Sequence, residues 1–238
     1  MKAGPGVTVV GFSGPDGSGK SSLLTATAGA ADHRGVPVHT TYLYGCVACR
    51  NLRLPGPLPR VVSSPGTVAL EWPGAPSPAR PSRWHRIHAA IDTAELAIRL
   101  QLACHRAGRT ARRAHSDVLV LTDRTPLDTL VKHDPPEGGW ITQRLHVLGK
   151  RYGSIALLDA GSDVLSARDG EHAAAGLERT RDNYRRWSGR MTGVRTVSTQ
   201  AASAEELARE VLDHVLGRGA GSAHLRPVPT GPEADSSS

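Results

Sequence analysis

The fold of this chain is decided by the stretch VTVVGFSGPDGSGKSS, which runs from Val7 to Ser22. Its first half is a short apolar run that is typical of a buried strand, and its second half is a glycine-rich turn. The turn, Gly14 to Ser21, fits the pattern G-x-x-x-x-G-K-[ST]. Because helix-forming residues follow, the sequence predicts a strand over 7–12, a tight loop and a helix over about 21–31.

The spacing of this motif suits a chain of phosphates. Glycines let the loop curl so that consecutive backbone N–H groups point inward at phosphate oxygens, and the positive end of the helix dipole adds to the attraction. The pattern assigns Lys20 to the β- and γ-phosphates and the Ser21 hydroxyl to Mg²⁺. The residues expected to bind the nucleotide are Gly14, Gly17, Ser18, Gly19, Lys20, Ser21 and Ser22.

The rest of the chain alternates short apolar runs with helical patterns. A long amphipathic helix begins near residue 82 or 83. The run 117–123 is apolar until it ends in an acid, as is typical of a fully buried parallel strand. We therefore predict an α/β fold of three layers, with a parallel sheet flanked by helices. Its other strands are expected over 36–43, 155–159 and 194–197.

One domain is expected to span residues 1–218. Within it, residues 54–83 are crowded with prolines, which break helices and remove backbone donors, so we predict a long and largely irregular insertion there. Residues 219–238 are rich in Gly, Ser, Pro and Ala, a composition that predicts a disordered tail.

The charge and composition limit the classes of partner. The formal net charge is +7, from 29 Lys and Arg against 22 Asp and Glu. Nearly all of the positive charge is Arg, in a chain rich in Ala, Gly and Pro, so part of the basicity reflects compositional bias, and nucleic acid is not expected as the principal ligand. The sequence shows no export signal, membrane-length run or disulfide framework, so we expect a cytoplasmic protein without a membrane partner.

A second candidate group of polar residues ends the strand over 117–123. Asp123 and Arg124 close this strand, and Asp128 follows shortly after. Because an acid at this strand end lies beside the phosphate loop, Asp123 is a candidate ligand of Mg²⁺ or its waters. Arg124 can clamp an anionic group of an acceptor through two hydrogen bonds. All three are candidates for substrate binding, and an ordinary surface ion pair is the alternative.

A charged segment follows the strand that ends at Asp159, and we assign a lid to residues 164–188. The segment carries several arginines, among them Arg168, Arg179 and Arg181. In kinases a mobile lid closes over the phosphates, and its arginines neutralise charge that develops on the transferred group. For any single arginine the alternative is a solvated helix face.

Together these motifs resemble the thymidylate kinase-like branch of the nucleoside monophosphate kinases. The shared features are Gly-x-Asp-Gly-Ser-Gly-Lys-Ser near the N-terminus, Asp-Arg after the strand over 117–123, and a later Leu-Asp strand followed by Arg-x-x-Glu and Arg-x-x-Tyr. The resemblance covers most of residues 7–217, without the proline-rich insertion. It implies a three-layer P-loop NTPase fold with a lid, ATP and Mg²⁺, and transfer of the γ-phosphoryl group to an acceptor.

The resemblance also implies roles for single residues. Asp16 matches the P-loop acid that reaches the acceptor's sugar, and Arg124 matches the arginine that holds the acceptor phosphate, with Asp123 as its acidic neighbour. Arg168 and Arg181 match the lid arginines. The catalytic residues expected from the motifs and the resemblance are Lys20, Asp16, Arg168 and Arg181.

The chain departs from the branch at three places. Gly17 stands where some members have a catalytic Arg, and members without that Arg supply one from the lid. After the second strand, members carry Arg-Glu-Pro-Gly, whereas residues 42–51 here read YLYGCVACRN. The branch stacks thymine on an aromatic residue, and the only Phe of this chain is Phe12 in the first strand.

The sequence therefore predicts an ATP-dependent kinase of a small molecule, with a nucleoside monophosphate as the first expected acceptor. Two alternatives stay open. One is a kinase of a sugar or specialised-metabolite hydroxyl in a biosynthetic pathway, favoured by the missing loop and the insertion. The other is a nucleotide-dependent regulatory protein that binds nucleic acid, suggested by the arginines of 106–113. The expected partners are ATP and the acceptor, with a homodimer as an open alternative.

Overall fold

A single mixed sheet forms the centre of the molecule. The computed structural model describes residues 6–43, 60–64, 67–71, 83–159, 174–200, 202–217 and 225–227. Within these residues six strands form a sheet of order β2-β5-β1-β6-β7-β8, in which all neighbours are parallel except β7 and β8. The strands are β1 (Val7–Ser13), β2 (Val38–Tyr42), β5 (Val118–Asp123), β6 (Ser154–Asp159), β7 (Val194–Ser198) and β8 (Leu225–Pro227).

Strand β1 lies between β5 and β6, and its register decides which strand ends meet. Phe12 pairs with Asp123 of β5, and Ser13 pairs with Leu157 of β6. The carboxyl ends of the three strands therefore reach the same edge. In the sheet, β5 and β2 lie on one side of β1, and β6 and β7 lie on the other side. The strand order therefore changes direction at β1. Such a switch point at the carboxyl ends is where open α/β sheets bind their ligands.

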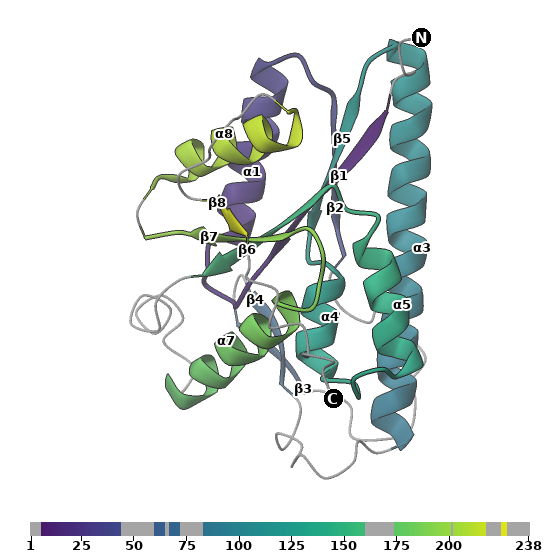
Figure 1. Ribbon diagram of the computed structural model, residues 1–238, viewed down its shortest axis with the longest axis vertical. Coiled ribbons are helices and arrows are strands. Elements are labelled where there is room, and N and C mark those ends of the chain that lie inside the picture. The colour runs from purple at the N-terminus through teal and green to yellow at the C-terminus, as the bar shows by residue number, and fades with distance from the viewer. Residues whose placement is uncertain are drawn as a thin grey trace, which may run out of the picture.

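Helices cover both faces of the sheet (Figure 1). One face carries α1 (Lys20–His33) and α8 (Ala204–Val215), and the other carries α3 (Arg83–Ala114), α4 (Pro126–His133), α5 (Trp140–Gly149) and α7 (Ala174–Ser188). Each face has its own apolar core: Phe12 and Leu121 belong to the first, and Val120 and Trp187 to the second. The predicted α/β class, with a parallel sheet flanked by helices, is confirmed.

The long helix α3 follows from its sequence pattern. Its buried positions recur at helical spacing, and many of them are alanines, which let the helix pack closely against the sheet. The helix begins at Arg83 as predicted. No helix among the described residues combines the length and the apolar character that crossing a membrane requires.

Two segments that were predicted to be irregular contain short strands. The proline-rich insertion 54–83 contains an antiparallel hairpin of β3 (Arg60–Ser64) and β4 (Thr67–Glu71), built from short β-branched runs between the prolines. The tail 219–238, predicted to be disordered, contributes β8, which extends the sheet beyond β7. Proline is tolerated on such an edge strand, which explains the place of Pro227.

Candidate functional site

The loop between β1 and α1 curls around the ammonium group of Lys20. Lys20 Nζ donates hydrogen bonds to the carbonyl oxygens of Gly14, at 2.8 Å, and Pro15, at 2.7 Å. Gly14 has a φ of 147°, and a Cβ there would lie 2.7 Å from Leu158 O and 2.9 Å from Ser18 Oγ. Only glycine fits this turn, so the first residue of the motif is required by the geometry of the loop.

Helix α1 begins at Lys20, directly after the loop. Its N-cap residue, Gly19, has a left-handed backbone and makes no side-chain capping bond, and the first turn carries no acidic residue. The N–H groups of this first turn therefore have no side-chain cap among the described residues. Ser21 and Ser22 lie exposed in the first turn. This arrangement suits an anion and agrees with the phosphate site predicted from the motif.

Asp123 ends β5 beside the first turn of α1. Ser21 Oγ lies 3.5 Å from Asp123 Oδ2, and the second oxygen, Oδ1, is buried with no hydrogen-bond partner among the described residues. Burial raises the pKa of Asp123 above its usual range, although Arg124 and Lys20 act in the opposite direction. A buried carboxylate short of partners, next to a hydroxyl, fits a Mg²⁺ ion.

The ion would need further ligands from the substrate. Within the described part of the chain, no group of three or more His, Cys, Asp or Glu residues could hold a metal. Mg²⁺ commonly binds through one or two protein oxygens together with substrate phosphates and waters, which is what Ser21 and Asp123 offer.

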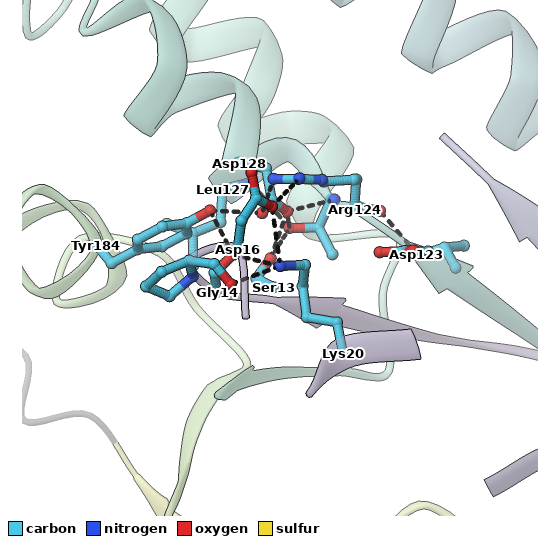
Figure 2. A network of polar contacts seen from close by, with 12 residues as sticks. Ser13, Gly14, Asp16, Lys20, Asp123, Arg124, Leu127, Asp128 and Tyr184 are labelled. Carbon is cyan, nitrogen blue, oxygen red and sulfur yellow. Dashed lines mark hydrogen bonds and ion pairs between the residues drawn. The ribbon is translucent and has the colours of Figure 1, made fainter. Parts of the chain in front are cut away.

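Arg124 links the loop to the start of α4 (Figure 2). Its Nη2 donates to Asp16 Oδ1 at 2.6 Å, and its Nη1 lies 3.6 Å from Asp128 Oδ1. The backbone of Arg124 has a φ of 78°, which is unfavourable for a residue other than glycine, and its N–H donates to Phe12 O at 3.1 Å. The surrounding contacts therefore hold both the backbone and the side chain of Arg124.

Asp16 stands at the rim of this group and is about half exposed. Burial opposes its charged form, but Arg124 and then Lys20, 3.6 Å away, outweigh that effect and lower the pKa of Asp16 below its usual range. For Lys20, burial and Arg124 lower the pKa of the ammonium group, and three carboxylates oppose them. Asp16 is therefore ionised at neutral pH, as its predicted contact with an acceptor requires.

Asp128, predicted to bind substrate, is engaged with the protein instead. Its Oδ2 accepts from the backbone N–H of Thr125 at 2.7 Å and from Ser13 Oγ at 2.6 Å, and its Oδ1 accepts from the Tyr184 hydroxyl at 2.7 Å. It is buried and completes a capping box with Thr125 at the start of α4. We therefore interpret Asp128 as a residue that positions Arg124 and Tyr184.

Tyr184 of α7 is a site residue that the sequence analysis did not single out. Its hydroxyl lies 2.7 Å from Asp128 Oδ1 and 3.0 Å from Gly14 O, so its one proton can reach either oxygen. Burial and the nearby Asp128 carboxylate raise its pKa well above the usual range, which keeps the hydroxyl neutral. The signal in the sequence was the Arg-x-x-Tyr pattern, because residues three apart share a helix face.

Arg181 lies on the same face of α7 and binds the end of β6. Its Nε donates to Asp159 Oδ1 at 2.6 Å, and its Nη2 donates to Asp159 Oδ2 at 3.2 Å. Both residues line a cavity of about 320 Å³ bounded by Pro15 of the loop, Tyr184 and Thr196 of β7. Arg181 therefore lies near the loop, with its guanidinium group held by Asp159.

The predicted lid, 164–188, includes a helix that is firmly packed at its C-terminal end. Trp187 is almost completely buried, and its Nε1 donates to Asp134 Oδ1 at 3.1 Å, while Tyr184 contacts the loop. These contacts pack this end of α7 against the rest of the domain, and the mobility of the lid stays a prediction. Arg168, the other predicted lid arginine, lies outside the described residues.

The structure thus gathers most of the predicted residues at one edge of the sheet. Lys20, Ser21, Asp16, Asp123 and Arg124 lie around the loop, as expected. A scan against known protein families finds no match for this chain, and a search of curated proteins finds none either.

Proposed function

We propose that this chain is an ATP-dependent kinase of the P-loop type, which transfers the γ-phosphoryl group to a small-molecule acceptor. The observation that carries the proposal is a coincidence of features at one sheet edge. A loop that requires glycine, a buried lysine, an uncapped helix start and the Ser21–Asp123 pair meet where parallel sheets bind ligands. A polyphosphate with Mg²⁺ uses all of these features.

Each residue has a distinct role in this proposal. Lys20 and the start of α1 bind the β- and γ-phosphates, and Ser21 and Asp123 hold Mg²⁺. Mg²⁺, when bound, supplies positive charge to the phosphate oxygens. Asp16 and Arg124 lie on the side of the loop that faces α4, where an acceptor would be positioned. Phosphoryl transfer needs little covalent help from a protein, so such positioning and charge neutralisation account for catalysis.

Two side chains of α7 reach the site and contribute to positioning and charge neutralisation. Tyr184 fixes the carbonyl of Gly14 and therefore the entrance of the loop. Of the two lid arginines predicted to be catalytic, Arg181 lies within the described residues. If its guanidinium group moved from Asp159 to the γ-phosphoryl group, it would bring a positive charge to the negative charge that develops there. The acceptor expected from the motif resemblance is a nucleoside monophosphate.

The test is the loss of phosphoryl transfer in Lys20→Ala. Removing this ammonium group should abolish ATP-dependent phosphorylation of an acceptor panel, measured by ADP release, while the circular dichroism spectrum stays that of the wild type. Lys150→Ala is the matched control, because Lys150 is exposed at the end of α5. Retention of turnover by Lys20→Ala would refute the proposed function.

A further inference from the structure

We infer that the acceptor offers a hydroxyl group to the site, and that Asp16 binds this hydroxyl; the inference rests on the proposed kinase function. Such an acceptor is an alcohol, for example a nucleoside or a sugar, in place of the nucleoside monophosphate that the sequence motifs imply. The charges around Arg124 are paired in a way that favours such an alcohol.

Within the network drawn in Figure 2, carboxylates outnumber cations. Among the described residues of the network in Figure 2, the cations are Lys20 and Arg124, and the carboxylates are Asp16, Asp123 and Asp128. A Mg²⁺ ion at Asp123 would neutralise only that carboxylate, since Asp16 and Asp128 already contact Arg124 at 2.6 and 3.6 Å. The positive charge that would attract an acceptor phosphate is therefore matched by two aspartates.

Arg124 is also fixed in this position. Asp128, one of its partners, is tied to the backbone of Thr125 and to the hydroxyl groups of Ser13 and Tyr184. The backbone of Arg124 is held by the hydrogen bond from its N–H to Phe12 O. A swing of the guanidinium group toward an incoming phosphate would break the contact with Asp16 and leave Asp128 with less positive charge nearby.

Asp16 is the member of the network best placed to meet an acceptor. It is about half exposed, and its contacts with Arg124 and Lys20 both use Oδ1. The second oxygen, Oδ2, can therefore accept a hydrogen bond at the rim. An ionised carboxylate only accepts hydrogen bonds, so it attracts the O–H of an alcohol and repels a phosphate dianion, which likewise only accepts.

The chemical step balances with the groups present. The acceptor oxygen forms a bond to the γ-phosphorus of ATP as the bond from that phosphorus to the β–γ bridging oxygen breaks, and ADP leaves with the electron pair. The hydroxyl proton passes to Asp16 Oδ2 and from there to water. In a loose transition state the acceptor oxygen keeps its proton until its bond to phosphorus is well formed and the O–H has become acidic, so a carboxylate of low basicity suffices.

The first experiment compares matched acceptor pairs with MgATP, each pair being an alcohol and its monophosphate, such as thymidine and dTMP or glucose and glucose phosphate. In every pair that is phosphorylated, we expect kcat/KM to favour the alcohol by at least about tenfold, the discrimination of a modest polar contact. Preference for the monophosphate overturns the inference, and the proposed kinase function survives that result.

A second experiment tests the preference for an alcohol when neither member of any acceptor pair is phosphorylated. The protein is saturated with MgADP and titrated calorimetrically with dTMP. We expect weak binding by the wild type, an affinity at least about tenfold higher for Asp16→Asn, and loss of that gain in Asp16→Asn/Arg124→Gln, because the substitution frees the charge of Arg124. An affinity that is unchanged or lower in Asp16→Asn overturns the inference.

The control variant replaces an aspartate outside the site, and MgADP binding by the wild type tests the proposed kinase function separately. Asp213→Asn removes an aspartate that pairs with Arg34 at the same 2.6 Å, far from the loop on α8, and should leave dTMP binding unchanged. If MgADP itself does not bind the wild type, the proposed function fails, and this failure is distinct from a preference for monophosphates.

Discussion

At the scale of single residues, the site holds groups in states that oppose stability. Arg124 keeps a left-handed backbone, and Asp123 keeps a buried carboxylate with one oxygen that has no partner among the described residues. Such states persist only where the surroundings enforce them, and they are concentrated at functional sites. Because burial opposes the ionisation of Asp123, replacing this residue gives a test that does not require the acceptor to be known.

Asp123→Asn should raise the stability of the ligand-free protein at neutral pH. The folded-state pKa of Asp123 lies above the ordinary value of 3.8, so the folded state loses stability as the pH rises from 3.8 to that folded-state pKa, and the full cost remains at higher pH. The advantage of the variant should vanish below about pH 3.8, where the carboxyl group is protonated in both states. Urea denaturation at several pH values measures it.

The same variant should lose its advantage when MgATP is added. The wild type gains stability from the bound ion and nucleotide, and the variant lacks one ligand of the ion, so the shift in melting temperature should be larger for the wild type. An equal shift for both proteins would show that Asp123 does not hold the ion.

Gly14→Ala should destabilise the protein and weaken MgATP binding. The added Cβ would approach Leu158 O and Ser18 Oγ to within 3 Å at a backbone angle that alanine rarely adopts. A cost of about 1–3 kcal/mol is typical of such strain. Gly29→Ala is the control: Gly29 is exposed within α1 with open space around it, and alanine there should stabilise the helix by about 0.5–1 kcal/mol.

At the scale of elements, α7 connects the glycine-rich loop between β1 and α1 to the end of β6. Tyr184 reaches Gly14 and Arg181 reaches Asp159, both from one face of the helix. Trp187 anchors this end of the helix in the core beneath α3, α4 and α5. A rigidly placed helix of this kind can hold catalytic groups more accurately than a free loop can.

Arg181→Ala should lower turnover about 100-fold, which is the effect typical of removing one preorganised donor to a developing charge. The KM for ATP should change little, because the contact would form only in the transition state. Arg209→Ala, on the exposed face of α8, is the control. If turnover stays near normal in Arg181→Ala, the catalytic cation must come from another residue, such as Arg168.

At the scale of the whole molecule, the sequence predicted the features that have local signals. The strand–loop–helix unit over 7–33, the strand over 117–123 and the long helix each have a pattern within a short stretch of sequence, and the structure contains all three. The strand β8 was missed because its partner, β7, lies nearly thirty residues earlier, and no local pattern marks the pairing. The hairpin β3–β4 was not predicted because the prolines around it favour irregular structure, and its strands are only five residues long.

The role of Asp128 could not be predicted for a similar reason. Its proximity to Asp123 and Arg124 along the chain suggested substrate binding. Its actual partners include Ser13 and Tyr184, which are 115 and 56 residues away in the sequence. Only the packing of β1, α4 and α7 brings these groups together, so the difference between a binding residue and a positioning residue depends on tertiary structure.

The most direct test of the central claim is a calorimetric titration of MgATP into the wild type and Lys20→Ala. We expect the wild type to bind one nucleotide per chain, with the affinity falling when Mg²⁺ is removed, because Lys20, the start of α1 and the Ser21–Asp123 pair act on the same phosphates. Lys20→Ala should lose at least about tenfold in affinity. Absence of binding to the folded wild type, or equal affinity in the two proteins, would contradict the assignment of this loop as a nucleotide site.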